Sequence, residues 1–264
     1  MSYNVRLFDI YEWNRKDNPE DYNKDIIKFI ADQKPEILCI QEYYTGSRHQ
    51  ISYNDSILQK SDLKYSSVER IKNRDRILPF GLATFSKYPI INSFRKEFSN
   101  STINFCLVTD IVIGNDTVRV INTHLESIKF GKEDYDFVNE LANNNLNNNI
   151  TDNSKAILAK MARAYRKRAP QADELSEFIS QSPYRVIVLA DLNDTPVSYT
   201  YQKLTNTMND AFARAGSGLG YTYSNFLALR LDYIFLDKTI NCNDYRIVRQ
   251  TFSDHYPVIA EIGL

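Results

Sequence analysis

The sequence has 264 residues, of which 43% are hydrophobic and 25% are charged, the composition of an ordinary soluble globular protein. Its 32 Lys and Arg residues balance 33 Asp and Glu residues, so the net charge of −1 argues against a protein that coats nucleic acid through bulk charge, although it allows a local basic patch. No apolar run approaches the roughly 18–20 residues of a membrane span, and the composition also excludes a disordered, collagen-like or disulfide-stapled chain.

Short apolar runs rich in β-branched and aromatic residues recur along the whole chain and predict strands. Each run is bounded by Asn, Asp, Gly or Pro, which are typical of turns. Two of the runs are separated by Gly114, Asn115 and Asp116, which predict a hairpin. In chain order, the predicted strands are Tyr3–Phe8, Ile37–Gln41, Leu82–Tyr88, Phe105–Ile113, Thr117–Leu125, Arg185–Leu192, Leu231–Leu236, Tyr245–Thr251 and Val258–Ile262.

Two segments between these strands have the apolar spacing of helices. The first, Asp21–Gln33, has one apolar face and ends before Pro35. The second, Ser154–Ser180, is longer, and Pro170 is expected to kink or divide it. Strands predominate and no change in composition marks a linker, so we predict a single α/β domain over residues 1–264.

Three local features have a less direct interpretation. The Asn-rich segment Asn143–Ile150 suits a mobile surface loop or a loop that covers the substrate. Lys155–Arg168 carries six basic residues and no acidic one, which fits a solvated helix face or a surface that contacts a phosphate-rich substrate or an anionic membrane. The three cysteines are far apart, and two lie inside apolar runs, so we expect buried free thiols.

Carboxylates, amides and histidines gather where the predicted strands end, the position where α/β proteins usually place functional groups. Asp191 and Asn193 follow one such strand, and an extended backbone directs two side chains with this spacing to the same side. A carboxylate beside an amide can hold a hard cation, or orient a water molecule and a phosphoryl oxygen. A turn with an Asx cap ahead of a helix would explain the same residues without any function.

Glu42 follows the predicted strand Ile37–Gln41. A glutamate that emerges from a buried strand needs a cation or a hydrogen-bonding partner, because an unpaired buried carboxylate costs on the order of several kcal/mol. A metal ion would meet this need, and so would a structural ion pair.

Two of the three histidines also lie in polar clusters at strand ends. His124 follows one apolar run, and His255 follows Asp254 directly, with Asp232 available to orient its ring. A lone histidine is more often structural, but these neighbouring carboxylates favour a catalytic role for His255. The third histidine, His49, lies in a polar loop and is expected at the surface.

Other catalytic classes do not fit these residues. No Gly-x-Ser-x-Gly elbow is present for a serine hydrolase, and the glycine-rich run Gly216–Gly220 lacks the Lys that follows in a phosphate-binding P-loop. Three histidines and three scattered cysteines are too few for a zinc hydrolase. Oxygen ligands with one or two histidines remain, and they suit Mg²⁺ or Mn²⁺ and the cleavage of phosphate esters.

In this order, the motifs resemble those of the endonuclease/exonuclease/phosphatase superfamily, which includes pancreatic deoxyribonuclease, neutral sphingomyelinases and inositol polyphosphate 5-phosphatases. The resemblance extends from Ser2-Tyr3-Asn4-Val5 to Ser253-Asp254-His255-Tyr256-Pro257. Each motif alone is weak, but six motifs in the family's order are specific. The resemblance implies the deoxyribonuclease I-like fold, a four-layer α-β-β-α sandwich of two mixed sheets.

The resemblance also implies a metal site. Asn4 matches an asparagine that helps to position the metal and the phosphate. Glu42, in Ile40-Gln41-Glu42, matches the main metal-binding glutamate, and Asp254 matches a carboxylate near the metal. The implied cofactor is Mg²⁺, with Mn²⁺ as an alternative, as one or two ions.

Five further residues match catalytic groups of the family. His124, in Asn122-Thr123-His124-Leu125, matches a histidine that contacts the scissile phosphate, with protonation of the leaving group as a further role. Asp191 and Asn193 match the pair that positions the attacking water and the phosphoryl oxygens. Asp232 matches the aspartate that orients the final histidine, His255, which acts as general base or phosphate stabiliser. Whether Asp191 or His255 takes the proton from the water stays open.

These residues predict a metal-dependent hydrolase of phosphate esters that uses in-line attack by water, in the first place a nuclease-like phosphodiesterase. A phosphomonoesterase, a sphingomyelinase-like lipid head-group phosphodiesterase and a non-catalytic binding domain are the alternatives. The expected partner is thus a nucleic acid, a lipid head group or a small phosphate, and no obligate protein partner is evident. Aromatic residues beside the motifs suit a lipid substrate or ordinary packing; they are Tyr43, Tyr44, Tyr199, Tyr201, Tyr221, Tyr223 and Phe226.

The first motif begins at Ser2, directly after Met1. We therefore expect the sequence to be the soluble part of a longer chain, with a membrane tether upstream as one arrangement. No signal peptide or membrane span is expected within the sequence itself.

Overall fold

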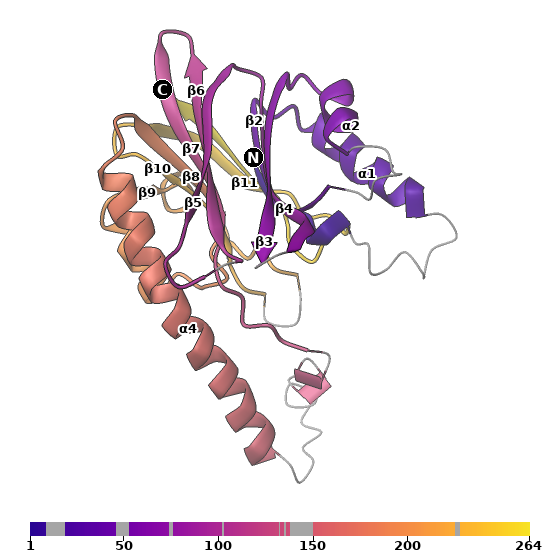
Figure 1. Cartoon of the computed structure of the whole chain (residues 1–264), viewed down its shortest axis with the longest axis vertical. Coiled ribbons are helices and arrows are strands. Elements are labelled where there is room, and N and C mark those ends of the chain that lie inside the picture. Colours follow the sequence, from indigo (N-terminus) through magenta and orange to yellow (C-terminus); the bar gives the residue numbers. More distant parts are fainter. Residues whose placement is uncertain are drawn as a thin grey trace.

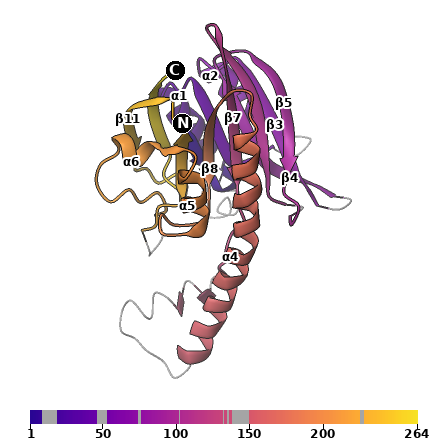
Figure 2. The same cartoon turned by 90° about the vertical axis from the view of Figure 1, so that its left-hand side faces the viewer.

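The computed structural model describes residues 1–8, 19–45, 53–73, 76–101, 103–131, 133–134, 136–137, 150–224 and 228–264. Two six-stranded β-sheets pack face to face, and helices cover their outer faces (Figure 1 and Figure 2). The predicted four-layer α/β sandwich of two mixed sheets is therefore confirmed.

Both sheets have a parallel pair of strands at the centre, β1–β2 in the first sheet and β7–β8 in the second, and antiparallel neighbours on either side. In spatial order, the first sheet contains β11 (Asn241–Ile247), β12 (Val258–Gly263), β1 (Ser2–Asn4), β2 (Ile37–Tyr44), β4 (Arg76–Ser86) and β3 (Tyr65–Asn73). The second contains β5 (Ile90–Glu97), β6 (Phe105–Ile113), β7 (Asp116–His124), β8 (Arg185–Asp191), β10 (Asp232–Leu236) and β9 (Asn209–Asp210).

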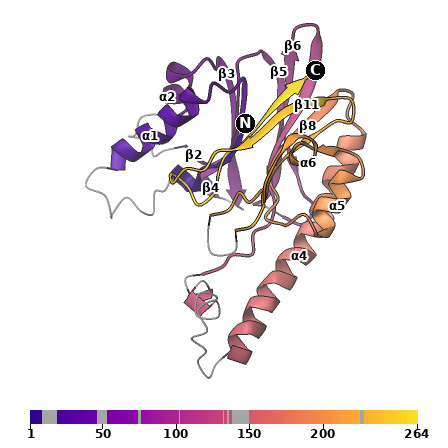
Figure 3. The same cartoon turned by 180° about the vertical axis from the view of Figure 1, so that it is seen from behind.

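The helices lie outside the sheets (Figure 3). α1 (Pro19–Asp32) and α2 (Tyr53–Lys60) bury apolar side chains against the first sheet. α4 (Ile150–Ser180) and α5 (Tyr199–Thr205) cover the second sheet, and the short α6 (Ala211–Ala215) lies beside β10 and β11. No helix among the described residues is long and apolar enough to cross a membrane.

Side-chain alternation along the strands separates the apolar layers. In β8, Val186 and Val188 pack toward α4, whereas Ile187 and Leu189 pack against the first sheet. The same alternation makes Asp191, at the end of β8, the next side chain that points between the two sheets.

The structure differs from the sequence-based prediction at several elements. The sequence does not predict β3 and β5, because both are edge strands with mostly exposed or half-buried side chains and hence no apolar run. β1 ends at Asn4 rather than at Phe8, because Arg6, Leu7 and Phe8 all have positive φ, between 45° and 56°.

Pro170 does not divide α4, and beyond it Leu175 and Ile179 still pack in the core cluster of the second sheet. The hairpin at Gly114 is present, with the glycine at φ 62°. All three cysteines are free, and Cys242 is only half-buried. His49, Phe226 and the segment Asn143–Ile150, except for the first residue of α4, lie outside the described residues.

A polar contact joins the centres of the two sheets. Asn122 on β7 donates from Nδ2 to the backbone oxygens of Ile40 (3.1 Å) and Ala83 (2.9 Å) in the first sheet. Its Oδ1 accepts a hydrogen bond from Gln41 Nε2 at 2.8 Å. β2 has a bulge directly after Ile40, so the Asn122 side chain pairs backbone groups at the point where the ladder is interrupted.

We expect Asn122→Ala to lower the free energy of unfolding by about 2–4 kcal/mol, because buried donors and acceptors lose their partners. Urea denaturation measures this loss. Asn92→Ala is the matched control: Asn92 is exposed on the edge strand β5, its side chain donates to Asp110 on β6 at 3.0 Å, and its loss is expected to cost less than about 1 kcal/mol. Equal losses in the two variants would contradict a special role for the contact between the sheets.

Candidate active site

Polar residues from the second sheet form a row at one edge of the sandwich. His124 on β7 and Asp191 on β8 are register partners, and Asp191 is also the register partner of Asp232 on β10. Register partners point to the same face of a sheet, so all three side chains face the first sheet. A slip of one residue in any of these strands would turn its side chain toward the helices instead.

Asn4 and Glu42 reach the same place from the first sheet. Leu38 and Ile40 on β2 pack with α1, so regular alternation would direct Glu42 outward as well. The bulge after Ile40, with Glu42 at φ 51°, reverses its direction. Asn4 Nδ2 donates to Asp191 Oδ2 at 2.9 Å and lies 3.5 Å from Glu42 Oε1.

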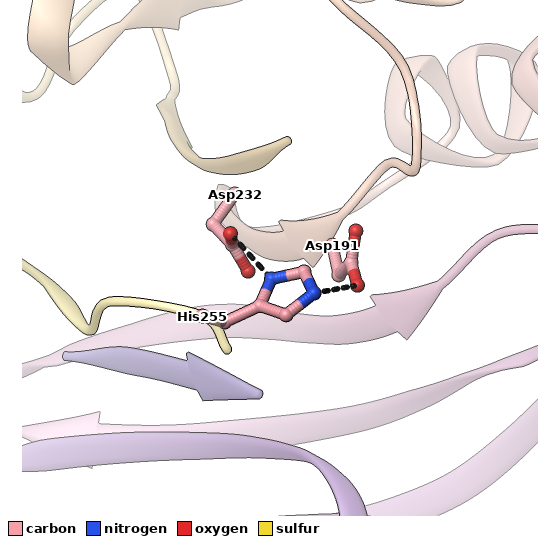
Figure 4. Close-up of side chains that lie close together, drawn as sticks. All are labelled: Asp191, Asp232 and His255. Atoms are coloured by element: carbon pink, nitrogen blue, oxygen red, sulfur yellow. Dashed lines mark hydrogen bonds and ion pairs between the residues drawn. The ribbon is translucent and has the colours of Figure 1, made fainter. Parts of the chain in front are cut away.

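The ring of His255 lies between two carboxylates (Figure 4). Its Nδ1 is 2.8 Å from Asp232 Oδ2, and its Nε2 is 3.9 Å from Asp191 Oδ2. The backbone N–H of Asp232 donates to Thr222 Oγ1 at 3.0 Å, and the ring of Tyr223 packs 4.9 Å from the His255 ring. Hydrogen bonding and aromatic packing together fix the orientation of the imidazole.

This surrounding charge favours the protonated form of His255. Burial lowers the pKa of His255, but the carboxylates of Asp232 and Asp191 and the hydrogen bond to Asp232 outweigh burial and raise the pKa to about 10. Burial also raises the pKa of Asp232, although the positive charge of His255 opposes this. At neutral pH, His255 therefore directs one N–H toward each carboxylate.

His124 and Asn193 complete the contacts around Asp191. His124 Nε2 lies 3.4 Å from Asp191 Oδ2 and 3.9 Å from Glu42 Oε1. The backbone N–H of Asn193 donates to Asp191 Oδ1 at 2.8 Å, and its side-chain amide donates to the backbone oxygen of Leu125 at 3.1 Å. Asp191 is fully buried, so these donors fix both of its carboxylate oxygens.

Asp254 pairs with a cation that the sequence analysis did not single out. Its Oδ2 lies 3.7 Å from Arg6 Nε. The backbone N–H of Arg6 donates to Asn4 Oδ1 at 3.0 Å, and Ser253 Oγ donates to the backbone oxygen of Asn4 at 2.9 Å. Arg6 thus brings a positive charge to this edge of the site. In the sequence, only its position two residues after Asn4 could have indicated that it lies near the site.

Two basic residues of α4 hold the loops that carry the site. Arg168 is fully buried; its Nε lies 3.1 Å from Asp194 Oδ2, and its Nη1 donates to the backbone oxygen of Glu126 at 2.9 Å. Lys167 Nζ lies 3.0 Å from Glu126 Oε1. The interpretation of Lys155–Arg168 as a solvated or phosphate-binding face is therefore wrong for Arg168, which ties together the loops after β7 and β8.

The donors at this edge fit a hard divalent cation. Ligand atoms of Asp191, Asp232 and His255 all lie within 4.8 Å of one another, so this buried group could hold a metal once His255 has lost its second ring proton. Asp232 Oδ1 is buried without a hydrogen-bond partner among the described residues. Oxygen atoms predominate in this group and in the metal ligands predicted from the sequence, and Mg²⁺ and Mn²⁺ prefer oxygen ligands. The predicted set was Asn4, Glu42 and Asp254.

Residues 1–255 match the Endonuclease/Exonuclease/phosphatase family. The chain belongs to this family. The resemblance inferred from the strand-end motifs is thereby confirmed, whereas no curated protein sequence gives a match.

Solved structures share the family fold at low sequence identity. A mannosyl-6-phosphatase from Bacteroides thetaiotaomicron is 16% identical, with a TM-score of 0.68 over 100% of this chain and 98% of that chain. Humanized TDP2 from D. rerio, with 14 mutations, is 15% identical, with a TM-score of 0.66 over 100% of this chain and 97% of that chain. The human Nocturnin catalytic domain with bound sulfate is 17% identical, with a TM-score of 0.67 over 98% of this chain and 90% of that chain.

Replacement of Asp232 tests the cause of the raised histidine pKa. Asp232→Asn is expected to bring the pKa of His255 from about 10 back toward 6.5, because it removes a carboxylate and its charge-assisted hydrogen bond. NMR titration of the ring resonances in metal-free protein measures this. Asp116→Asn, at an exposed aspartate that pairs with Arg185, is the control. An unchanged His255 pKa in Asp232→Asn would refute the assignment.

The same pKa predicts how stability depends on pH. A histidine whose pKa rises on folding stabilises the folded state below its unfolded pKa of 6.5, and the contribution is lost as the pH rises toward 10. The free energy of unfolding of the metal-free protein should therefore fall between about pH 7 and pH 10 more steeply than that of His255→Gln. Parallel pH profiles from urea denaturation would contradict this prediction.

Proposed function

We propose that the protein is a metal-dependent hydrolase that cleaves phosphate esters by in-line attack of water, in the first place as a phosphodiesterase. Its membership of the family supports this proposal. The observation that carries it is the single row of His124, Asp191 and Asp232, with His255 between the two aspartates. Such a row presents proton-transfer groups and positive charge in a fixed geometry before the substrate arrives.

We assign the attacking water to Asp191. Its carboxylate is buried and fixed from both sides, and it lies near both histidine rings. Because His255 already holds a proton at neutral pH, it suits stabilisation of the negative phosphoryl oxygens better than removal of a proton. Asp191 is then the group that accepts the proton of the water, and Asn193 helps to hold the phosphoryl oxygens.

His124 has a different position. Its side chain is 20% exposed and lies near Glu42 Oε1, whereas the His255 side chain is only 8% exposed. A partly exposed ring at this edge suits contact with the scissile phosphate and donation of a proton to the leaving group.

Glu42, with Asn4 and Asp254, would hold Mg²⁺ or Mn²⁺. When bound, the metal neutralises charge that develops on phosphorus-bound oxygens. The Asn4 amide has a further role, because its hydrogen bond to Asp191 keeps that carboxylate in place.

A phosphomonoesterase is the second candidate. A mannosyl-6-phosphatase shares the fold of this chain, and the Arg6 guanidinium beside Asp254 would suit the second negative charge of a monoester. Hydrolysis of bis-p-nitrophenyl phosphate and of p-nitrophenyl phosphate, with Mg²⁺ and with chelator, separates the candidates. Chelator-sensitive cleavage of the diester supports a phosphodiesterase, cleavage of the monoester alone supports a phosphatase, and cleavage of neither contradicts the catalytic proposal.

Asp191→Asn and His255→Ala are each expected to lower turnover at least ~100-fold without unfolding the protein, the magnitude typical of acid–base groups. Steady-state rates with the better of the two esters measure the effect, and circular dichroism checks the fold. The exposed Asp116→Asn is the matched control and should retain normal turnover. Near-normal rates in both site variants would overturn the assigned roles.

A further inference from the structure

A cavity of about 560 Å³ lies directly beside the candidate active site. Glu42 and His124 form part of its wall, so the cavity is continuous with the place where the phosphate is expected. All of its lining residues lie within the part of the chain that the structure describes. Its volume falls in the range of roughly 300–1,000 Å³ that is typical of small-molecule sites.

The lining of this cavity is largely apolar. Its floor comes from a small separate core cluster on β3, β4 and β6, in which Ile71, Leu82 and Phe105 are buried. Phe80 and Ile103 are only half-buried, so they present apolar surface to the cavity. A ligand that displaces water from apolar walls of this kind binds with a more favourable free energy.

Few cationic side chains line the cavity. Among its described lining residues, Lys129 is the only Lys or Arg, and its Nζ lies 3.4 Å from Glu126 Oε1. Glu126 also pairs with Lys167, so this charge is shared within a local network. A polyanionic strand would need cations along its path, which this lining does not supply.

We propose that this cavity binds an apolar substituent of the substrate, such as an aryl group or a hydrocarbon chain, while the attached phosphate occupies the site at Glu42 and His124. This inference rests on the proposed function, since it names the class of phosphate ester that the site accepts. Aryl and alkyl groups both have apolar surface that these walls can bury, and an aryl ring can additionally stack on the half-buried Phe80.

Direct binding tests the proposal without catalysis. Calorimetry with methylphosphonate, hexylphosphonate and phenylphosphonate, in the presence of Mg²⁺, keeps the anion constant and changes only the apolar group. We expect phenylphosphonate, hexylphosphonate or both to bind at least about 10-fold more tightly than methylphosphonate. A gain for the phenyl compound alone identifies an aryl substituent, and a gain for the hexyl compound alone identifies a chain.

Variants test whether the gain in affinity comes from this cavity. Ile103→Asp, in the cavity wall, should abolish it, and the milder Phe80→Ala should reduce it by about 3-fold or more if the aspartate variant does not fold. Ile259→Asp is the matched control, because Ile259 is also half-buried but lines a different cavity. Equal binding of the three phosphonates, or a gain that persists in both cavity variants, overturns the apolar subsite but leaves the hydrolase proposal intact. Binding of none of them contradicts the phosphate site and therefore both proposals.

Discussion

The hydrogen bonds that the Asn122 side chain makes across the sandwich set the relation between its two halves. A sheet-on-sheet core of aliphatic side chains is non-directional and tolerates sliding, but an amide bonded to Ile40 O, Ala83 O and Gln41 Nε2 has one satisfactory position. That position coincides with the bulge in β2, and the bulge directs Glu42 inward. One buried contact therefore fixes how the first sheet, with Asn4 and Glu42, faces the residue row of the second sheet.

The electrostatics of the site follow from this enforced proximity. Asp191 and Asp232 are buried on neighbouring strands, and two adjacent carboxylates are unfavourable in a poorly solvated place unless positive charge or hydrogen-bond donors compensate them. Protonated His255 lies between them with one N–H toward each carboxylate, and Asn4 and the Asn193 backbone supply neutral donors. The raised pKa of His255 is thus a consequence of the register between β8 and β10 rather than of the histidine alone.

Much of this arrangement could be predicted from local pattern, and the rest could not for physical reasons. The runs that became β6, β7, β8 and β10 are buried on both faces, so their apolar composition reveals them, whereas β3 and β5 are half-solvated edges and leave no such trace. The spacing of Asp191 and Asn193 suggested a site, but the alignment of His124, Asp191 and Asp232 depends on strand order, which no local pattern contains. The sequence wrongly predicts an exposed Arg168, because a basic residue of a helix is normally exposed. Here the two loops that Arg168 joins bury its side chain.

Arg168 and the cavity beside Glu42 together bear on the kind of ester the site suits. Basic residues of α4 are the natural candidates for contact with a nucleic-acid backbone, yet Arg168 and Lys167 are engaged by Asp194 and Glu126 within the protein. Arg168 and Lys167 hold the loops after β7 and β8 together, and between these loops the Asn193 side chain donates to the backbone oxygen of Leu125. With the Arg168 charge internal and the adjoining cavity largely apolar, binding energy from this cavity beyond the phosphate itself is expected to come from excluded water rather than from ion pairs. For the proposed hydrolase, a small or apolar phosphate ester would suit this cavity better than a long polyanion.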